Sequence, residues 1–139
     1  GLVFVGSCDN RLYALDAATG AKRWEFQTGA EIHSSPAVHE DLVFVGSRDG
    51  CVYAVEVRTG KKKWQFDSGD WVESSPAVSG GSLYFGSHDH KLYALEVESG
   101  VCLWHYETGG EVASSPAVSQ GSVFVGSNDG SVYCFRSRQ

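Results

Sequence analysis

Short apolar runs recur along the chain, and turn residues separate them. Leu42–Gly46 is one such run, and Val52–Val57 follows it after a Ser-Arg-Asp-Gly turn. Apolar side chains on consecutive positions are typical of strands that are buried on both faces, because the side chains of a strand alternate between its two sides. No stretch of useful length shows apolar residues at the helical period. The pattern therefore predicts an all-β protein.

The runs belong to an internal repeat with a period of 40 residues. The motif Gly-Ser-x-Asp begins at positions 6, 46, 86 and 126, and Ser-Ser-Pro-Ala-Val begins at 34, 74 and 114. Residues 2–41 align with residues 42–81 without a gap. We interpret residues 1–139 as a single domain with repeat units at about 1–33, 34–73, 74–113 and 114–139.

Each complete unit is expected to contain four short strands, named A to D from the inside outwards. In the second unit they are Ser34–Val38, Leu42–Gly46, Val52–Val57 and Lys63–Phe66. The pair Asp49-Gly50 predicts a tight B–C hairpin of type I′, and Asn10 and His90 take the place of the glycine in two other units. The strand order along the chain becomes B-C-D, A-B-C-D, A-B-C-D, A-B-C.

Four-stranded units that bury both faces against neighbouring units are the blades of a β-propeller, whereas a sandwich would leave one face wet. The chain would form about 3.5 antiparallel blades of an incomplete ring. An open half-ring would expose the apolar faces of its two end blades. Three outcomes stay open: a symmetric dimer that makes an eight-bladed ring, a segment of a longer propeller, or a compact four-bladed ring. We favour the first two.

Composition and charge exclude some classes of function. The 139 residues carry 11 Lys and Arg against 17 Asp and Glu, a net charge of −6, which disfavours nucleic-acid binding. No apolar stretch is long enough for a membrane-spanning helix, and none has the pattern of a signal peptide. Four cysteines occur: Cys134 is expected to be a buried thiol, Cys102 to be exposed, and Cys8 could pair with Cys51 if the geometry allows.

A tryptophan motif adds a resemblance to a known family. Ala14-Leu15-Asp16-Ala17-Ala18-Thr19-Gly20, followed by Trp24, resembles the docking motif of PQQ-like (quinoprotein dehydrogenase-like) propeller repeats. The motif returns with Gly60 and Trp64 and again with Gly100 and Trp104. The resemblance covers essentially the whole chain. It implies that each tryptophan packs against the neighbouring blade, so that the motif is structural.

The same resemblance suggests a second function. Quinoprotein dehydrogenases have about eight blades, calcium ligands and adjacent cysteines beneath the cofactor, whereas no two cysteines are adjacent here. Many proteins with this repeat bind no quinone and act as interaction platforms. We therefore expect no cofactor and no enzymatic activity, with a fragment of a PQQ-dependent dehydrogenase as the alternative.

The residues that differ between units predict where a partner binds. B–C hairpins and D–A links should share one face of the ring, and constant strands that present different polar loop residues are how propellers build binding surfaces. Trp71 is the strongest candidate, since exposed tryptophan is unusual outside interfaces. The candidates on this face are Glu31, His33, Arg48, Trp71, Glu73, His88, His90 and Glu111.

No catalytic or metal site is expected from the sequence. His88-Asp89-His90 resembles a metal pair but lacks a third ligand, and the repeated aspartates, Asp49 among them, are interpreted as turn residues. The leading hypothesis is a non-catalytic scaffold that binds a protein, peptide or glycan partner and completes its ring by self-association or within a longer propeller. A segment that only self-assembles is the other alternative.

Overall fold

The computed structural model describes residues 1–136, which form four antiparallel sheets. Sheets of three strands stand at the two ends, and sheets of four strands lie between them. The strands, sheet by sheet, are β1 (Leu2–Gly6), β2 (Arg11–Asp16) and β3 (Lys22–Gln27); β4 (Ala37–His39), β5 (Leu42–Gly46), β6 (Cys51–Glu56) and β7 (Lys62–Asp67); β8 (Ala77–Ser79), β9 (Ser82–Gly86), β10 (Lys91–Glu96) and β11 (Cys102–Glu107); β12 (Ala117–Ser119), β13 (Ser122–Gly126) and β14 (Val132–Arg136).

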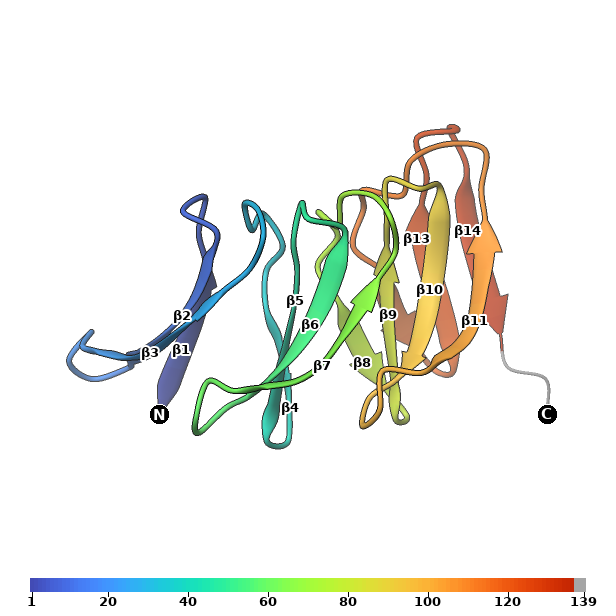
Figure 1. Ribbon diagram of the computed structural model, residues 1–139. Helices are drawn as coiled ribbons and strands as arrows, with labels where there is room; N and C mark the ends of the chain where they lie inside the picture. The colour runs from blue at the N-terminus through green and yellow to red at the C-terminus, as the bar shows by residue number, and fades with distance from the viewer. Residues whose placement is uncertain (137–139) are drawn as a thin grey trace.

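The four sheets are successive blades of a partial propeller. They stand side by side in chain order, with β1–β3 at one end and β12–β14 at the other (Figure 1). Within residues 1–136 the blades do not close into a ring, so the compact four-bladed ring is not formed by this chain. The expected order B-C-D, A-B-C-D, A-B-C-D, A-B-C is confirmed strand for strand.

The innermost strands differ from the prediction at their start. The ladder begins at Ala37 and not at Ser34, because Ser34 and Ser35 make other bonds. The Ser34 hydroxyl accepts a hydrogen bond from the Gly46 amide at 3.1 Å, and the Ser35 amide donates to Ser75 Oγ of the next blade at 2.9 Å. Ser35 therefore joins neighbouring blades where the inner strands approach one another, whereas Ser34 ties the start of the inner strand to β5 of its own blade.

The predicted B–C hairpin at Asp49-Gly50 is present, but its turn is not of type I′. Among the residues of this turn only Gly50 has a positive φ, at 92°, and the Gly50 amide bonds to the Ser47 carbonyl at 3.2 Å. This is a type I turn followed by one left-handed residue, a common alternative for a slightly longer loop. Asn10 and His90 adopt the left-handed conformation at the equivalent position, as expected, with φ of 75° and 78°.

The tryptophans dock on the neighbouring blade, as the motif implies. Trp24 Nε1 donates to the Val57 carbonyl at 2.8 Å, and the ring lies against Gly60, where a Cβ would come within 2.7 Å of it. Trp64 repeats this arrangement on Gly100. Gly60 and Gly100 are required for two reasons: φ is positive at each position, and a side chain there would collide with the indole.

Of the expectations for the cysteines, the one for Cys134 is wrong, the one for Cys102 is met in part, and the conditional pairing of Cys8 with Cys51 is not formed. All four cysteines, which lie within the described residues, are free, so Cys8 and Cys51 do not pair. Cys134 is exposed and not buried, since no strand or blade among residues 1–136 covers that face of the last sheet. Cys102 is half-buried, and this burial raises the pKa of its thiol.

Candidate functional site

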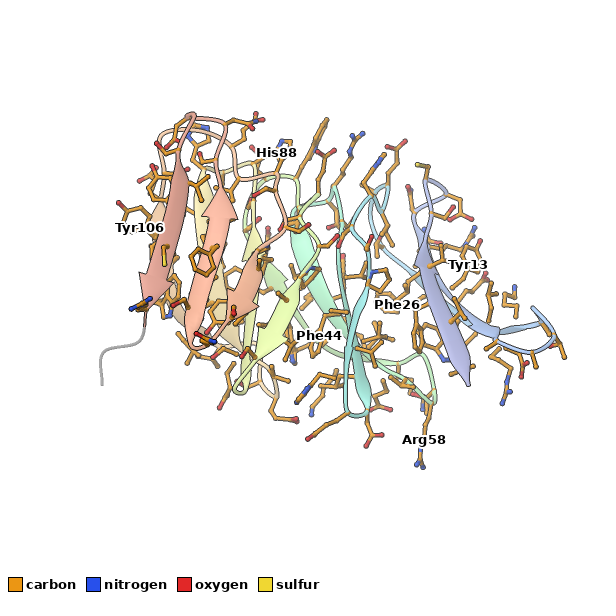
Figure 2. All side chains as sticks on the ribbon, turned by 180° about the vertical axis from the view of Figure 1, so that it is seen from behind. Tyr13, Phe26, Phe44, Arg58, His88 and Tyr106 are labelled. Carbon is orange, nitrogen blue, oxygen red and sulfur yellow. The ribbon has the colours of Figure 1, made fainter. Side chains whose placement is uncertain are left out.

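The B–C hairpins and D–A links meet on one face, as the alternation of strands predicts. Neighbouring units are joined there by backbone hydrogen bonds of 2.9 Å, from the Arg48 amide to the Glu31 carbonyl and from the His88 amide to the Trp71 carbonyl. The same bond recurs between Asn128 and Glu111. Each hairpin tip therefore lies against the link of the preceding blade. We call this surface the loop face; His88 marks it in Figure 2.

A chain of charged groups runs across the loop face from blade to blade. The guanidinium of Arg48 donates to Glu31 Oε2 at 3.0 Å and to Glu73 Oε1 at 2.8 Å. His88 Nε2 lies 3.1 Å from Glu73 Oε2, and His88 Nδ1 lies 3.6 Å from Glu111 Oε2. We call these five residues the charged row. Their order in space is Glu31, Arg48, Glu73, His88, Glu111, so residues from three units form one connected network.

Trp71 lies beside the charged row and is exposed to solvent. Its side chain is 43% exposed, and the guanidinium of Arg48 stacks over its ring at 4.4 Å from the centroid. His88 stands at its side with ring centroids 5.6 Å apart. Arg48 and His88 therefore hold the indole of Trp71 in place. Its exposed part is an apolar surface surrounded by charged side chains.

The electrostatics of the charged row favour ionised carboxylates. Burial alone would raise the pKa of Glu73, but the hydrogen bonds and charges of Arg48 and His88 outweigh it, so the pKa is lowered. The hydrogen bond from His33 and the charge of Arg48 lower the pKa of Glu31. The hydrogen bond to Glu73 in turn raises the pKa of Arg48. Three carboxylates face one guanidinium, and the row carries net negative charge at neutral pH.

Of the remaining predicted residues, His33 adjoins the charged row and His90 does not. His33 lies at one end of it, with Nε2 3.0 Å from Glu31 Oε2 and 3.8 Å from Cys8 Sγ. His90 is exposed at its hairpin tip. Asp89 is bonded within its own turn, where it accepts from the Tyr93 hydroxyl and the Lys91 amide. The interpretation of the repeated aspartates as turn residues is confirmed.

A family model described as "Outer membrane protein assembly factor BamB" matches residues 1–139. The chain belongs to this family of PQQ-like propeller repeats. Among solved structures, BamB from Moraxella catarrhalis superposes with a TM-score of 0.86 at 23% identity, covering 96% of this chain and 42% of that one. This BamB-family chain thus spans less than half the length of that relative. A comparison with curated proteins found no match.

Two further structures share the fold. The computationally designed Ika4 protein has a TM-score of 0.87 at 20% identity, covering 97% of this BamB-family chain and 84% of its own. Quinohemoprotein alcohol dehydrogenase ADHIIG from Pseudomonas putida HK5 has a TM-score of 0.83 at 18% identity. The match covers 91% of this chain and 27% of the dehydrogenase. At these identities the likeness establishes the propeller architecture alone.

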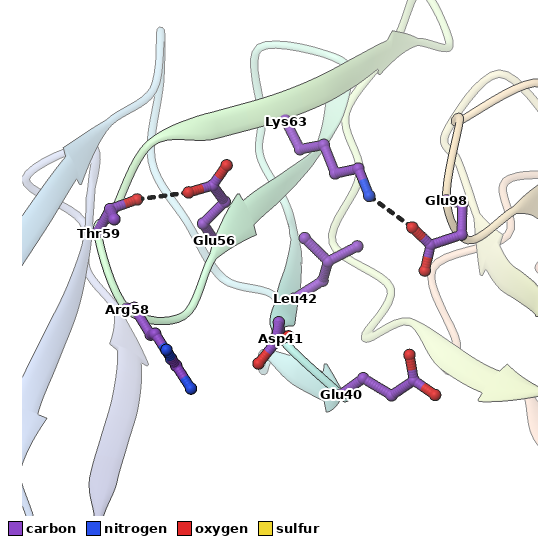
Figure 3. Close-up of a pocket in the computed structure, with 8 residues that line it drawn as sticks. All are labelled: Glu40, Asp41, Leu42, Glu56, Arg58, Thr59, Lys63 and Glu98. Atoms are coloured by element: carbon purple, nitrogen blue, oxygen red, sulfur yellow. Dashed lines mark hydrogen bonds and ion pairs between the residues drawn. The ribbon is translucent and has the colours of Figure 1, made fainter.

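The opposite face of this BamB-family propeller carries a hollow that sequence variation did not indicate. Figure 3 shows this space of about 490 Å³ between the second and third blades. Its polar groups are partly paired: Lys63 bonds to Glu98, and Thr59 donates to Glu56 at 2.8 Å. The hollow is lined by Glu40, Asp41, Leu42, Glu56, Arg58, Thr59, Lys63 and Glu98.

Sequence reasoning missed one grouping on the loop face. Cys8 lies against Glu31 and His33, although more than 20 residues separate it from either. The only signal in the sequence was that the residue type at each of these three positions differs from one repeat unit to the next. In residues 1–136 no helix is long and apolar enough to cross a membrane.

Proposed function

We propose that this chain is a non-catalytic propeller module whose loop face binds a protein or peptide segment carrying basic side chains. The observation that carries the proposal is the charged row with Trp71 beside it. Arg48 holds one face of the indole, and 43% of the side chain stays exposed for a partner. Exposed tryptophan and arginine are the residue types most enriched in binding hot spots.

The charge of the row selects the partner. Glu31, Glu73 and Glu111 outnumber Arg48, and the whole chain has a net charge of −6. A lysine or arginine of the partner would meet both carboxylates and the exposed indole, to which cations are attracted. A glycan would use the indole but not the charges. Strong weakening of binding by salt therefore distinguishes a basic peptide from a sugar.

Selection of a displayed random peptide library on the immobilised chain tests the proposal. We expect the selected peptides to be rich in Lys and Arg and to bind at least about tenfold more weakly to the Trp71→Ala variant, a loss of about 1.4 kcal/mol. Glu73→Gln should weaken them less. Arg58→Ala, which removes an exposed charge beside the hollow on the opposite face, is the control and should leave binding unchanged.

Four results would contradict the proposal. Peptides that bind Trp71→Ala as well as the parent would remove the loop face from consideration. Peptides lost with Arg58→Ala would move the site to the opposite face. Glycan-array binding that depends on Trp71 and resists salt would replace the peptide with a sugar. Dye-linked alcohol oxidation after addition of PQQ and calcium would support the dehydrogenase alternative, and we expect none.

Exposed apolar side chains at both ends favour an additional role in self-association. At the first blade Val3 and Val5 of β1 are 50% and 44% exposed, and in the last blade Phe124 and Val132 are 39% and 78% exposed. Patches of this kind mark interaction surfaces. We propose that they are covered by a second copy in an eight-bladed ring, or by further blades of a longer propeller.

Sedimentation of the isolated chain tests the second copy. We expect a dimer that Val5→Lys or Val132→Lys converts to monomer. Val38→Lys places the same charge on β4 of a central blade, where the valine is 53% exposed, and should leave the dimer intact. A well-folded parent chain that stays monomeric without aggregating would exclude the dimer.

A further inference from the structure

Three potential metal ligands converge at the first junction of the loop face. His33 Nε2 lies 3.8 Å from Cys8 Sγ and 3.0 Å from Glu31 Oε2, and all three ligand atoms lie within 4.8 Å of one another. Among residues 1–136 this is the one group of three Cys, His, Asp or Glu side chains that comes together in this way. The set combines a sulfur, an imidazole nitrogen and a carboxylate oxygen, which are the ligand types of zinc.

The backbone holds these ligands in place. The Ile32 amide donates to the Ser7 carbonyl at 3.1 Å, which fixes the link beside the hairpin that carries Cys8. Ile32 is only 3% exposed, and because it points into the core, Glu31 and His33 on either side of it lie on the outer surface. Glu31 and His33 therefore flank the buried Ile32. Cys8 follows Ser7, the residue to which Ile32 is hydrogen-bonded.

Comparison with the other units shows that the grouping is not a by-product of the repeat. The backbone bond recurs from Val72 to Ser47 and from Val112 to Ser87, each at 3.0 Å, so the same three positions meet at every junction. Their occupants differ. The second junction has Arg48, Trp71 and Glu73, and the third has His88, Glu111 and Ala113.

The separations are close to those around a tetrahedral ion. Zinc bonds of about 2.3 Å to sulfur and about 2.0–2.2 Å to nitrogen and oxygen place two ligand atoms about 3.3–3.6 Å apart. The observed separations of 3.8 Å and 3.0 Å lie on either side of that range. We propose that Cys8, Glu31 and His33 bind a Zn²⁺ ion, with water as the fourth ligand.

Charge balance is compatible with the neighbouring guanidinium. On binding, the Cys8 thiol loses its proton to solvent, so thiolate and carboxylate together neutralise the ion. Arg48 donates to Glu31 Oε2 at 3.0 Å and would orient this carboxylate from the outer shell, facing a cluster without net charge. The site lies at one end of the loop face and shares Glu31 with the charged row, and its metal binding is tested without a partner.

Cobalt substitution tests the site in the reduced, chelator-treated chain. We expect one Co²⁺ per chain, with a thiolate-to-cobalt charge-transfer band and the intense visible bands of tetrahedral cobalt, and displacement by one equivalent of Zn²⁺. Cys8→Ser should abolish the charge-transfer band. Cys8→Ser and His33→Gln should each weaken Zn²⁺ binding at least tenfold, since even outer-shell changes cost about 10–100-fold.

Cys134→Ser is the matched control, because Cys134 is also an exposed cysteine but lies in the last blade. It should leave the spectrum and the affinity unchanged. A charge-transfer band that persists in Cys8→Ser, or one that disappears in Cys134→Ser, would overturn the proposal. So would weak binding with an octahedral spectrum. Thermal unfolding without metal, unchanged in all three variants, separates these results from misfolding.

Discussion

The first blade and the second blade contain the same five residues in very different surroundings. Leu-Val-Phe-Val-Gly forms β1 at residues 2–6 and β5 at residues 42–46. Every residue of β5 is buried, whereas Val3 and Val5 of β1 are 50% and 44% exposed. An identical strand is thus a core element in one blade and half-exposed in the other. The difference lies in the neighbours, because β5 has a blade on either side and β1 has one.

The residues of the docking motif also differ in exposure between the central and the end blades. Trp64 is 8% exposed on Gly100 of the next blade, but Trp104 in the equivalent column is 36% exposed. Gly20 has no tryptophan docked on it: apart from its chain neighbours, no atom of the described residues would lie within 4 Å of a Cβ there. The central blades have complete junctions, and each end blade has an open one. A repeat residue therefore contributes stability in proportion to the neighbour it meets.

The largest expected effect compares two phenylalanines of one column. Phe44→Ala removes a fully buried ring and should lower the free energy of unfolding by about 3–5 kcal/mol. Phe124 is 39% exposed in the single chain, so Phe124→Ala should cost no more than about half as much if the chain is monomeric. Urea unfolding of both variants measures the difference. Equal losses would show that Phe124 is covered in solution, which would support ring completion.

The second comparison uses three glycines with nearly identical backbones. Gly20, Gly60 and Gly100 have φ of 74°, 73° and 73°, so alanine imposes the same backbone strain at each, of about 1–2 kcal/mol. At Gly60 and Gly100 the new methyl also collides with a tryptophan, which adds about 1–3 kcal/mol. We expect Gly20→Ala to be the mildest in thermal unfolding. A loss of stability in Gly20→Ala as large as that in Gly100→Ala would indicate that an aromatic side chain from outside the described residues docks on Gly20.

The smallest effect concerns the charged row in acid. Because the folded-state pKa of Glu73 is lowered, its ion pair with Arg48 stabilises the chain above the unfolded pKa of about 4.3. That stability is lost as the pH falls from there through the folded pKa. We expect up to about 1 kcal/mol. Urea midpoints between pH 7 and 3 should fall less steeply in Glu73→Gln. The Glu98→Gln variant, which affects an exposed pair on the opposite face, is the control.

An acid profile of Glu73→Gln as steep as that of the parent chain would contradict this assignment. It would mean that other carboxylates determine the loss of stability in acid. Asp9 and Asp129, in the hairpin turns of the end blades, are alternatives, since hydrogen bonds from Tyr13 and Tyr133 lower the pKa of each carboxyl. Asp16 and Glu31 are further alternatives, since hydrogen bonds from the Thr19 amide and from His33 lower their pKa values. The experiment therefore separates the contribution of Glu73 from the contributions of these four carboxylates.

The sequence by itself determined the architecture. The period of 40, the turn residues and the paired apolar runs gave the strand order, the inner position of the Ser-Ser-Pro segment and the docking tryptophans, all of which the structure contains. It also placed Arg48, Trp71 and Glu73 on a common face. These features follow from local periodicity and from the alternation of strand direction, which are properties of a chain read in order.

Only the tertiary structure decided which apolar residues are covered and which polar residues meet. Cys134 occupies a column that is buried in complete blades, yet it is exposed because its neighbour is missing among the described residues. Cys8 meets His33 across 25 residues, and Arg48 reaches Glu73 across the same span. Side-chain burial and clustering depend on the distance between residues of different units, and that distance is set by how one blade packs against the next.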